Sequence, residues 1–318
     1  MGKSPNLLIV RTPFQAWFCL QLIDHLDIAN YDLLYITHNN SEEDKSYFSR
    51  LSSSATISDY AYLPPERFDL FTHLKLRLRL RSWFRDCGYK NVYVASINSL
   101  VINALVCRLS FAKLYTFDDG AANLVRGGPY YADPATNRMK LYRSLFRGLA
   151  VEKIRKRIAR HYSLYEGFGN IVDDNRMTYL RGWRNEFELV RDIGFLRKRT
   201  KRYFIGAPFE EVMSSREIEK MIDFMLVVGI DGYIKHPREK KELPIGGLII
   251  DKGGRIAEEV ILEDSAGCEV ELYGFLSSVM INLRGVSGKR VVFLPGHHRL
   301  TGVGELARES GCQEVYLN

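Results

Sequence analysis

The sequence predicts an α/β protein built from two doubly wound domains. Short runs rich in β-branched and aromatic residues alternate with helical windows along the whole chain, which is typical of parallel sheets covered by helices. The 318 residues, 46% of them hydrophobic, are enough for two domains of about 100–200 residues, each with its own core. A basic segment at 191–202 is the predicted boundary, giving domains of residues 1–195 and 196–318.

The first half begins with a strand at Asn6–Val10, followed by a helix at 14–26 whose apolar residues recur at helical spacing. Further elements follow as strands at 32–37 and 91–95, a helix at 99–109 and a strand at 113–117. Residues 74–81 alternate leucine with lysine or arginine, which is a strand pattern. A helix is predicted there instead, because a strand follows closely and an α/β unit places a helix before it.

The second half repeats this alternation. Its predicted strands are 202–205, 232–235, 269–273, 290–294 and 314–317. The first of them ends at Gly206-Ala207-Pro208, the second at His236-Pro237 and the third at residues 274–278. The two halves therefore predict two similar domains.

Basic residues are concentrated in three segments. The chain carries 45 Lys and Arg against 38 Asp and Glu, a net charge of +7. Residues 138–162 hold nine basic residues against Glu152, and 73–90 and 191–202 each hold six against one aspartate. This asymmetry favours an anionic membrane surface or a polyanion as a partner, whereas solvated helix faces are the simpler explanation.

Several classes of protein are disfavoured by what the sequence lacks. The five cysteines are scattered without a C-x-x-C pair, which argues against a disulfide framework and a structural zinc site. No signal peptide and no apolar run of about 18 residues is present, so a cytoplasmic protein is predicted. The dinucleotide fingerprint, Walker A, H-E-x-x-H and G-x-S-x-G motifs are absent too.

The candidate site consists of polar segments at strand ends, because ligands of open parallel sheets bind outside the carboxyl ends of the strands. These segments are Asp118-Asp119-Gly120, Gly206-Ala207-Pro208 with Glu210, Lys235-His236-Pro237-Arg238, and Ser277-Ser278. A carboxylate can take a proton from an attacking hydroxyl, hydroxyls at a helix N-terminus can hold a phosphate, and His and Arg can stabilise a leaving group. The set suits transfer from a phosphate-bearing donor.

Each segment also has a structural explanation. Asp-Gly is a common turn pair, His236 can be a surface residue at a strand end, and Ser277-Ser278 can be a helix N-cap. His297-His298 has no Cys or carboxylate nearby in sequence, so no metal site is predicted. The common placement of the segments at strand ends favours the functional interpretation.

Taken in order, these segments resemble the bacterial lipooligosaccharide sialyltransferases of glycosyltransferase family 52. The most specific match is 115–124 (YTFDDGAANL). Other matching segments are 94–96, 167–174, 177–180, 206–208, 236–238, 256–262 and 271–277. They run from about residue 90 to about residue 285, and the first 90 residues match more loosely.

The resemblance implies a GT-B fold, in which two Rossmann-like domains face each other across a cleft. The N-terminal domain would hold the acceptor and the C-terminal domain the CMP-sugar donor. It also implies CMP-sialic acid as donor, inversion at the anomeric carbon, no metal or other cofactor, and a homodimer. By that pattern, His236 with Pro237 and Arg238 faces the donor phosphate, and His236 acts there as general acid or electrostatic stabiliser.

Further roles follow from the same resemblance. Ser277 and Ser278 would bind the donor phosphate, Glu258 or Glu259 the ribose or cytosine, and the Asp118-Asp119-Gly120 loop the acceptor hydroxyl. The chain departs from the family at the residue after Gly206-Ala207-Pro208, where Phe209 replaces a catalytic aspartate. Either Glu210, one residue later, or Asp119 (or Asp118) is then the base, and Glu210 is favoured.

The leading hypothesis is a cytoplasmic, inverting sialyltransferase acting on a galactose-terminated glycolipid or lipid-linked oligosaccharide, as in lipooligosaccharide, O-antigen or capsule synthesis. The basic segments would hold it peripherally at the inner membrane, since each nearby Lys or Arg contributes about 1 kcal/mol. One alternative is a GT-B enzyme that uses another nucleotide sugar. A second is a non-catalytic, basic membrane- or nucleic-acid-binding protein. Acidic residues at the strand ends argue against nucleic acid as a partner.

Overall fold

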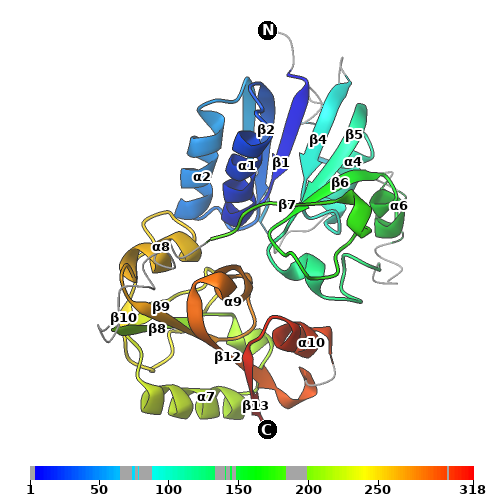
Figure 1. The fold of residues 1–318 in the computed structure, drawn as a ribbon. Coiled ribbons are helices and arrows are strands. Elements are labelled where there is room, and N and C mark those ends of the chain that lie inside the picture. The colour runs from blue at the N-terminus through cyan, green and yellow to red at the C-terminus, as the bar shows by residue number, and fades with distance from the viewer. Residues whose placement is uncertain are drawn as a thin grey trace. The chain divides into compact units, whose positions relative to one another are not determined.

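The computed structural model describes residues 4–64, 74, 75, 78, 88–132, 140, 144, 148–183, 199–298 and 301–318. The chain divides into two compact units, Met1–Leu180 and Arg181–Asn318 (Figure 1). The predicted boundary at 195/196 comes later in the chain and lies outside the described residues, as does most of the helix predicted at 74–81.

The first unit contains a seven-stranded parallel sheet in the order β3-β2-β1-β4-β5-β6-β7. The strands are β1 (Asn6–Val10), β2 (Tyr31–Thr37), β3 (Ile57–Tyr62), β4 (Tyr89–Val94), β5 (Phe111–Phe117), β6 (Ile158–Ser163) and β7 (Met177–Tyr179). The helices are α1 (Pro13–His25), α2 (Glu42–Ser52), α4 (Leu100–Val106) and α6 (Val151–Arg155), with short 3-10 helices at Ala122–Leu124 and Asp174–Arg176.

Helices cover both faces of this sheet because alternate strand residues point to opposite sides. Leu7 and Ile9 pack in one core cluster with Ile102 of α4 and Ile154 of α6. On the opposite face, α1 and α2 pack together, and Phe18 of α1 stacks on Phe117 of β5. The first unit is therefore doubly wound, as predicted.

The second unit repeats the arrangement with a six-stranded parallel sheet in the order β10-β9-β8-β11-β12-β13. The strands are β8 (Thr200–Ile205), β9 (Gly232–Ile234), β10 (Leu248–Ile249), β11 (Glu269–Gly274), β12 (Ser287–Pro295) and β13 (Gln313–Leu317). The helices are α7 (Ser215–Val228), α8 (Ala257–Asp264), α9 (Ser278–Asn282) and α10 (Gly302–Glu309), with 3-10 helices at Phe209–Glu211, Leu283–Gly285 and Gly296–His298.

The two faces of the second sheet have separate cores. Met221 and Met225 of α7 pack with Phe204, Tyr233 and Phe293. Helices α8, α9 and α10 cover the other face, which includes Tyr203, Leu272 and Val292. None of the described helices is both long and apolar enough to cross a bilayer.

Helix ends follow local sequence signals. Pro13 occupies the first turn of α1, after Thr12, whose side chain accepts a hydrogen bond from the N–H of Gln15. Helices α2 and α7 begin with capping boxes, formed by Ser41 with Asp44 and by Ser214 with Glu217. These caps satisfy backbone N–H groups that a helix N-terminus leaves unpaired.

Candidate active site

Both sheets share one strand order, and both change winding direction at their centre. The change falls between β1 and β4 in the first unit and between β8 and β11 in the second. Parallel sheets of this order bind ligands outside the carboxyl ends of the strands at that point. The predicted site residues lie after β5, β8, β9 and β11, so each unit has a polar edge at the expected place.

In the first unit, Asp119 is the half-buried carboxylate at this edge. Its Oδ2 accepts a hydrogen bond from the hydroxyl of Ser96 at 2.7 Å and another from Tyr130, and its Oδ1 accepts one from the amide of Gln15. Burial, and then the neighbouring Asp119 carboxylate, raise the pKa of Tyr130 well above its ordinary value, so the phenol remains a donor. The donors fix the orientation of the Asp119 carboxylate.

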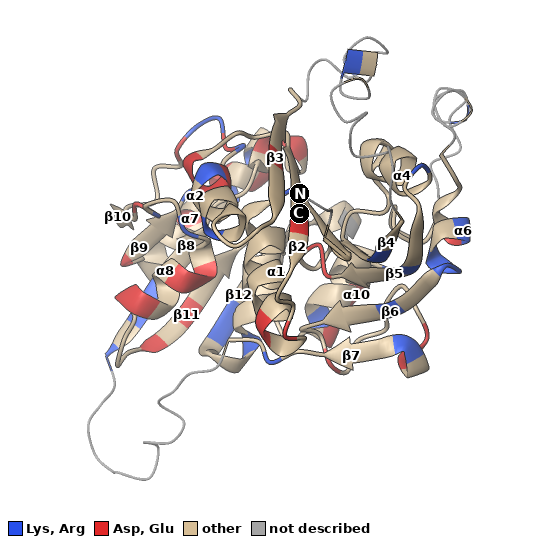
Figure 2. Ribbon diagram, turned by 90° about the horizontal axis from the view of Figure 1, so that it is seen from above, with Lys and Arg blue, Asp and Glu red and all other residues tan. Residues whose placement is uncertain are grey.

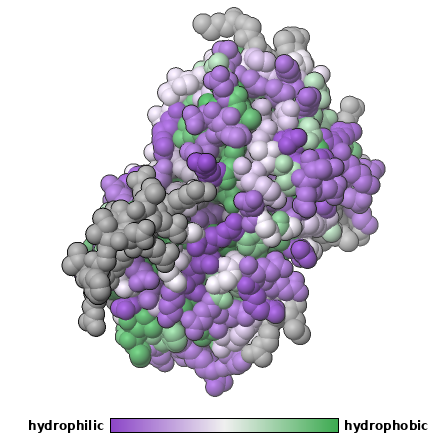
Figure 3. Space-filling model, in the orientation of Figure 1, coloured by the Kyte–Doolittle hydropathy of each residue, from purple (hydrophilic) through white to green (hydrophobic). Residues whose placement is uncertain are grey.

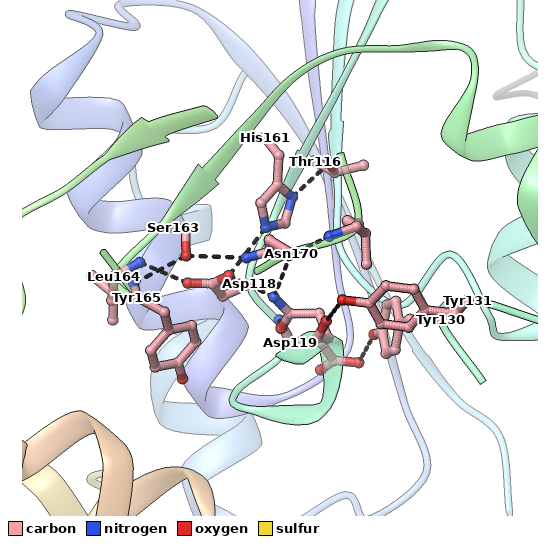
Figure 4. Close-up of polar contacts among 12 residues, drawn as sticks. Thr116, Asp118, Asp119, Tyr130, Tyr131, His161, Ser163, Leu164, Tyr165 and Asn170 are labelled. Atoms are coloured by element: carbon pink, nitrogen blue, oxygen red, sulfur yellow. Dashed lines mark hydrogen bonds and ion pairs between the residues drawn. The ribbon is translucent and has the colours of Figure 1, made fainter. Parts of the chain in front are cut away.

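Asp118 lies in a different environment, although it was predicted to be a catalytic and acceptor-binding residue. Its side chain is fully buried and accepts from Nε2 of His161 at 3.1 Å, Nδ2 of Asn123 at 2.9 Å and the N–H of Leu164 at 2.7 Å. The Thr116 hydroxyl lies 2.8 Å from Nδ1 of His161, which extends the network (Figure 4). Because this carboxylate is enclosed, it supports the loop and does not reach an acceptor.

Sequence reasoning missed Gln15, Ser96, Tyr130 and Arg11, which surround Asp119. Ser96 adopts a left-handed backbone conformation, with φ of 48°, and non-glycine residues in this region concentrate at functional sites. Arg11 follows β1; burial lowers the pKa of its guanidinium, and the charge of Asp119 opposes that effect. The buried Nε of Arg11 has no hydrogen-bond partner in the described part of the chain. Their positions after β1 and β4 were the available signal.

In the second unit, Phe209 and Glu210 follow β8, and their side chains lie in different environments. Phe209 is 1% exposed, and its ring packs on Phe204 with centroids 5.6 Å apart. Glu210, the next residue, is exposed. The position directly after Gly206-Ala207-Pro208 thus belongs to the hydrophobic core, and the carboxylate available at this edge is Glu210.

His236 lies in a tight turn after β9. The N–H of Glu239 donates to the carbonyl of His236 at 3.0 Å, and the N–H of Arg238 donates to Nδ1 of the His236 ring at 3.1 Å. An Nδ1 that accepts a hydrogen bond carries no proton, so the neutral ring holds its proton on Nε2. Burial, with the charges of Arg238 and Lys252, lowers the pKa of His236 to about 4. The imidazole is therefore a neutral hydrogen-bond donor at pH 7.

Basic side chains lie beside this turn together with carboxylates. Arg238 forms an ion pair with Glu211 at 3.0 Å, and Lys252 is close enough to lower the pKa of His236. Lys252 precedes Gly253 and Gly254, both in the left-handed region, in the loop before α8. Sequence reasoning missed Lys252, and a lysine beside a glycine pair ahead of a helix was the signal.

Ser277 and Ser278 begin α9, as predicted for an N-cap. Within the described residues, the buried hydroxyl of Ser277 has no hydrogen-bond partner. Buried hydroxyls are normally satisfied, so this one can still donate a hydrogen bond. Gly274 allows β8 to approach closely at this point, because a Cβ on it would collide with the Ile205 carbonyl at 2.5 Å.

The two predicted ribose- or cytosine-binding carboxylates differ in burial. Glu258 is 3% exposed and accepts a hydrogen bond from Asn282 of α9 at 2.7 Å, and burial raises its pKa. Glu259 is half-buried. Glu258 therefore joins α8 to α9, and Glu259 is the one of the pair that a nucleoside can reach.

Across the described residues, no group of three or more His, Cys, Asp or Glu side chains is arranged to hold a metal ion. The expectation that catalysis needs no metal stays a prediction.

Comparison with known proteins gives consistent matches. The sequence profile named Glycosyltransferase family 52 matches residues 31–296. The CMP-N-acetylneuraminate:beta-galactoside alpha-2,3-sialyltransferase of Pasteurella multocida is 29% identical over 286 residues, covering 89% of this chain and 88% of that protein. The N-acetyllactosaminide alpha-2,3-sialyltransferase of Haemophilus influenzae is 28% identical over 221 residues, 67% of each protein.

Solved structures agree with the fold. A crystal structure of the alpha/beta-galactoside alpha-2,3-sialyltransferase of Photobacterium phosphoreum has a TM-score of 0.55 at 13% identity and covers 98% of each chain. The glycotransferase of kitacinnamycin has a TM-score of 0.53 at 10% identity, covering all of this chain and 87% of that one. These likenesses confirm the predicted GT-B fold class. Since the family profile spans residues 31–296, the chain belongs to glycosyltransferase family 52 and is a glycosyltransferase.

Proposed function

We propose that this enzyme is an inverting, metal-independent sialyltransferase that uses CMP-sialic acid. The acceptor would be a galactose-terminated glycolipid or lipid-linked oligosaccharide. The relatives from P. multocida and H. influenzae carry the names of alpha-2,3-sialyltransferases. The observation that carries the proposal is the His236 turn, a neutral Nε2–H donor with Arg238 and Lys252 beside it. This arrangement suits a phosphate diester, which carries one negative charge and gains a second as CMP departs.

The donor phosphate would bind at the second unit. His236 donates from Nε2, and Arg238 and Lys252 supply positive charge. The Ser277 hydroxyl, which has no partner among the described residues, completes the set. When the bond between the anomeric carbon and the phosphate oxygen breaks, CMP leaves as an anion. Its departure depends on stabilisation of this negative charge more than on the supply of a proton. With its pKa near 4, His236 fits the role of stabiliser rather than general acid.

A carboxylate would take the proton of the acceptor hydroxyl as its oxygen bonds to the anomeric carbon. Glu210 is favoured because it is exposed, while Phe209 is buried. Asp119 is the alternative, since its donors hold the carboxylate in one orientation and leave it half-buried. The turnover of Glu210→Gln and Asp119→Asn separates the two, because loss of the base removes about 10²–10⁴-fold in rate.

The first experiment is a thermal-shift panel of CMP, CMP-sialic acid, UDP and GDP, with and without magnesium. We expect stabilisation by the two cytidine nucleotides alone, unchanged by magnesium. A shift with UDP or GDP and none with CMP would keep the glycosyltransferase and overturn the donor.

The proposal also predicts the effect of removing the imidazole. His236→Ala should lower kcat by about 10²–10³-fold, the usual effect of removing a group that stabilises transition-state charge. Transfer from CMP-sialic acid would be followed by CMP release, and cytidine binding would show that the fold is kept. A variant with the wild-type rate would contradict the role of His236.

We further propose that a basic surface of the first unit contacts an anionic membrane, where a lipid-linked acceptor is found. Lys153, Lys156, Arg157 and Arg160 are exposed on and after α6, where Figure 2 shows basic residues. Sedimentation with vesicles containing anionic lipid, at low and high salt, tests this contact. The homodimer stays a prediction, which light scattering tests.

A further inference from the structure

Glu239 is a carboxylate beside His236 that the proposed mechanism has not used. It is half-buried and follows the His236-Pro237-Arg238 segment. Its Oε2 accepts a hydrogen bond from the backbone N–H of His236 at 3.1 Å, and its Oε1 accepts one from the hydroxyl of Tyr233. The side chain therefore folds back across the turn that begins at His236.

Gly206 makes room for this carboxylate at the end of the neighbouring strand. A Cβ on Gly206 would collide with Oε2 of Glu239, and would lie 2.9 Å from the nitrogen of His236 and 3.0 Å from the carbonyl oxygen of Ile234. The N–H of Gly206 donates to that same carbonyl at 2.8 Å. The carboxylate of Glu239 thus packs against Gly206, at a point where the backbone of the segment after β8 is bonded to β9.

The anchor beneath Glu239 is rigid. Tyr233 is 1% exposed, and its ring packs edge-on against Phe204 with centroids 5.3 Å apart. A buried aromatic ring fixes the position of its hydroxyl, and that hydroxyl fixes Oε1. Oε2 is then left to hold the nitrogen of His236, which adds a side-chain anchor to the backbone bonds that already shape this turn.

The charges around Glu239 make it sensitive to pH. Burial, and then the negative charges of Glu210 and Glu242, raise its pKa to about 7, while the hydrogen bond from His236 acts in the opposite direction. The charged and titratable groups near this turn are Tyr233, Lys235, His236, Arg238, Glu210, Glu211, Glu242 and Lys252.

We propose that Glu239 is a positioning residue for sialyl transfer, whose ionised carboxylate ties the His236 turn to the buried Tyr233 and so keeps the Nε2–H of His236 in place for the donor phosphate. An ionised carboxylate accepts from both Tyr233 and His236, whereas a protonated one carries a proton that competes for one of these positions. This inference rests on the proposed function, because the phosphate is that of the proposed donor.

The test is the pH dependence of kcat for CMP-sialic acid in the full-length enzyme and in Glu239→Gln. The wild type should lose activity as the pH falls through about 7, the pKa of the carboxyl. In Glu239→Gln this acid limb should disappear, because the amide does not titrate. Its kcat should stay near the low value of the protonated wild type at every pH, since the NH₂ group, like the carboxyl proton, competes with one of the two donors. Glu239→Ala should lower kcat by about 10²-fold, the effect of a 1 Å misplacement of a catalytic group.

Two measurements separate positioning from folding. Cytidine, which lacks the phosphate, should bind Glu239→Ala as it binds the wild type, whereas CMP should bind the variant more weakly. The matched control is Glu242→Gln, which removes a carboxylate that pairs with Lys235 at 3.7 Å. The Glu242→Gln variant should keep the acid limb. The limb should move to lower pH, because one of the negative charges that raise the pKa of Glu239 has been removed.

The outcomes are distinct. The positioning role would be overturned if the acid limb at about pH 7 persisted in Glu239→Gln, or if Glu239→Ala had the wild-type kcat. Either result would leave the sialyltransferase proposal intact. A wild-type enzyme that neither binds CMP nor transfers sialic acid would overturn the proposed function, and the positioning role with it.

Discussion

Asp118 and Asp119 are neighbours in sequence, but their carboxylates lie in different environments. Asp118 is fully buried and accepts from His161, Asn123 and Leu164, while Asp119 is half-buried beside Ser96 and Tyr130. The enclosed carboxylate fixes the loop, and the loop fixes the accessible one. This division explains how a short turn with Gly120 in the left-handed region can present one carboxylate in a defined position.

Asp118→Asn tests this division of labour. The amide keeps one oxygen but turns an NH₂ group toward groups that are themselves donors, so we expect a loss of about 3 kcal/mol in the free energy of unfolding. Urea unfolding measures it. Asp119→Asn, at the half-buried position, should lose about 1 kcal/mol or less. Equal losses in the two variants would contradict the assignment.

At this scale the sequence predicted that the candidate residues lie at strand ends, but it did not predict their surroundings. Asp119, Glu210, His236 and Ser277 each follow a strand, and parallel sheets place such residues at one edge. Glu239 was missed because its role depends on the close approach of Gly206 from another strand. Such a contact is created by tertiary packing, and it leaves no periodic signal in the sequence.

Strands were predictable where apolar residues form a continuous run. The strand at Asn6–Val10 was predicted with its observed bounds, since four of its five residues are buried. β3, β6, β7 and β10 were not predicted. The first two residues of β3 and both residues of β10 lie at the surface, whereas β6 is buried at four of its six residues but includes the polar residues Arg160, His161 and Ser163. A strand at the edge of a sheet needs no apolar run, so its sequence resembles that of a loop.

The N-terminus of α7 gives a prediction at the scale of an element. Ser214 accepts from the N–H of Glu217, and Glu217 accepts in return from the N–H of Ser214. Ser214→Ala should lower the stability of the protein by about 1 kcal/mol, because backbone donors lose a partner. Ser215→Ala, at the exposed next position, is the matched control and should change little. If both serines behaved alike in thermal unfolding, the cap would not be contributing.

Across the whole molecule, each unit has its own hydrophobic core. The cluster that includes Ile9 and Val94 contains only residues of the first unit, and the two clusters around Leu272 and Phe204 contain only residues of the second. Among the exposed apolar side chains of the second unit, Val227 is 89% exposed and Leu248 is 73% exposed. Figure 3 shows a hydrophobic area on this unit where Figure 1 places α7.

Because the units have separate cores, we expect two unfolding transitions in calorimetry. Because the proposed donor site lies in the second unit, CMP should raise the midpoint temperature of only one of them. Because CMP would bind native second unit and not its unfolded chain, saturation at 100 times Kd should stabilise that unit by about 2.7 kcal/mol. Cap variants identify the transitions. Ser214→Ala should lower the midpoint temperature of the transition that CMP raises. Ser41→Ala, in the capping box of α2, should lower the midpoint temperature of the other. A single transition lowered by both variants and raised by CMP would mean that the two units unfold together. A CMP-sensitive transition that responded to Ser41→Ala alone would place the donor in the first unit, against the mechanism built on His236 and Ser277.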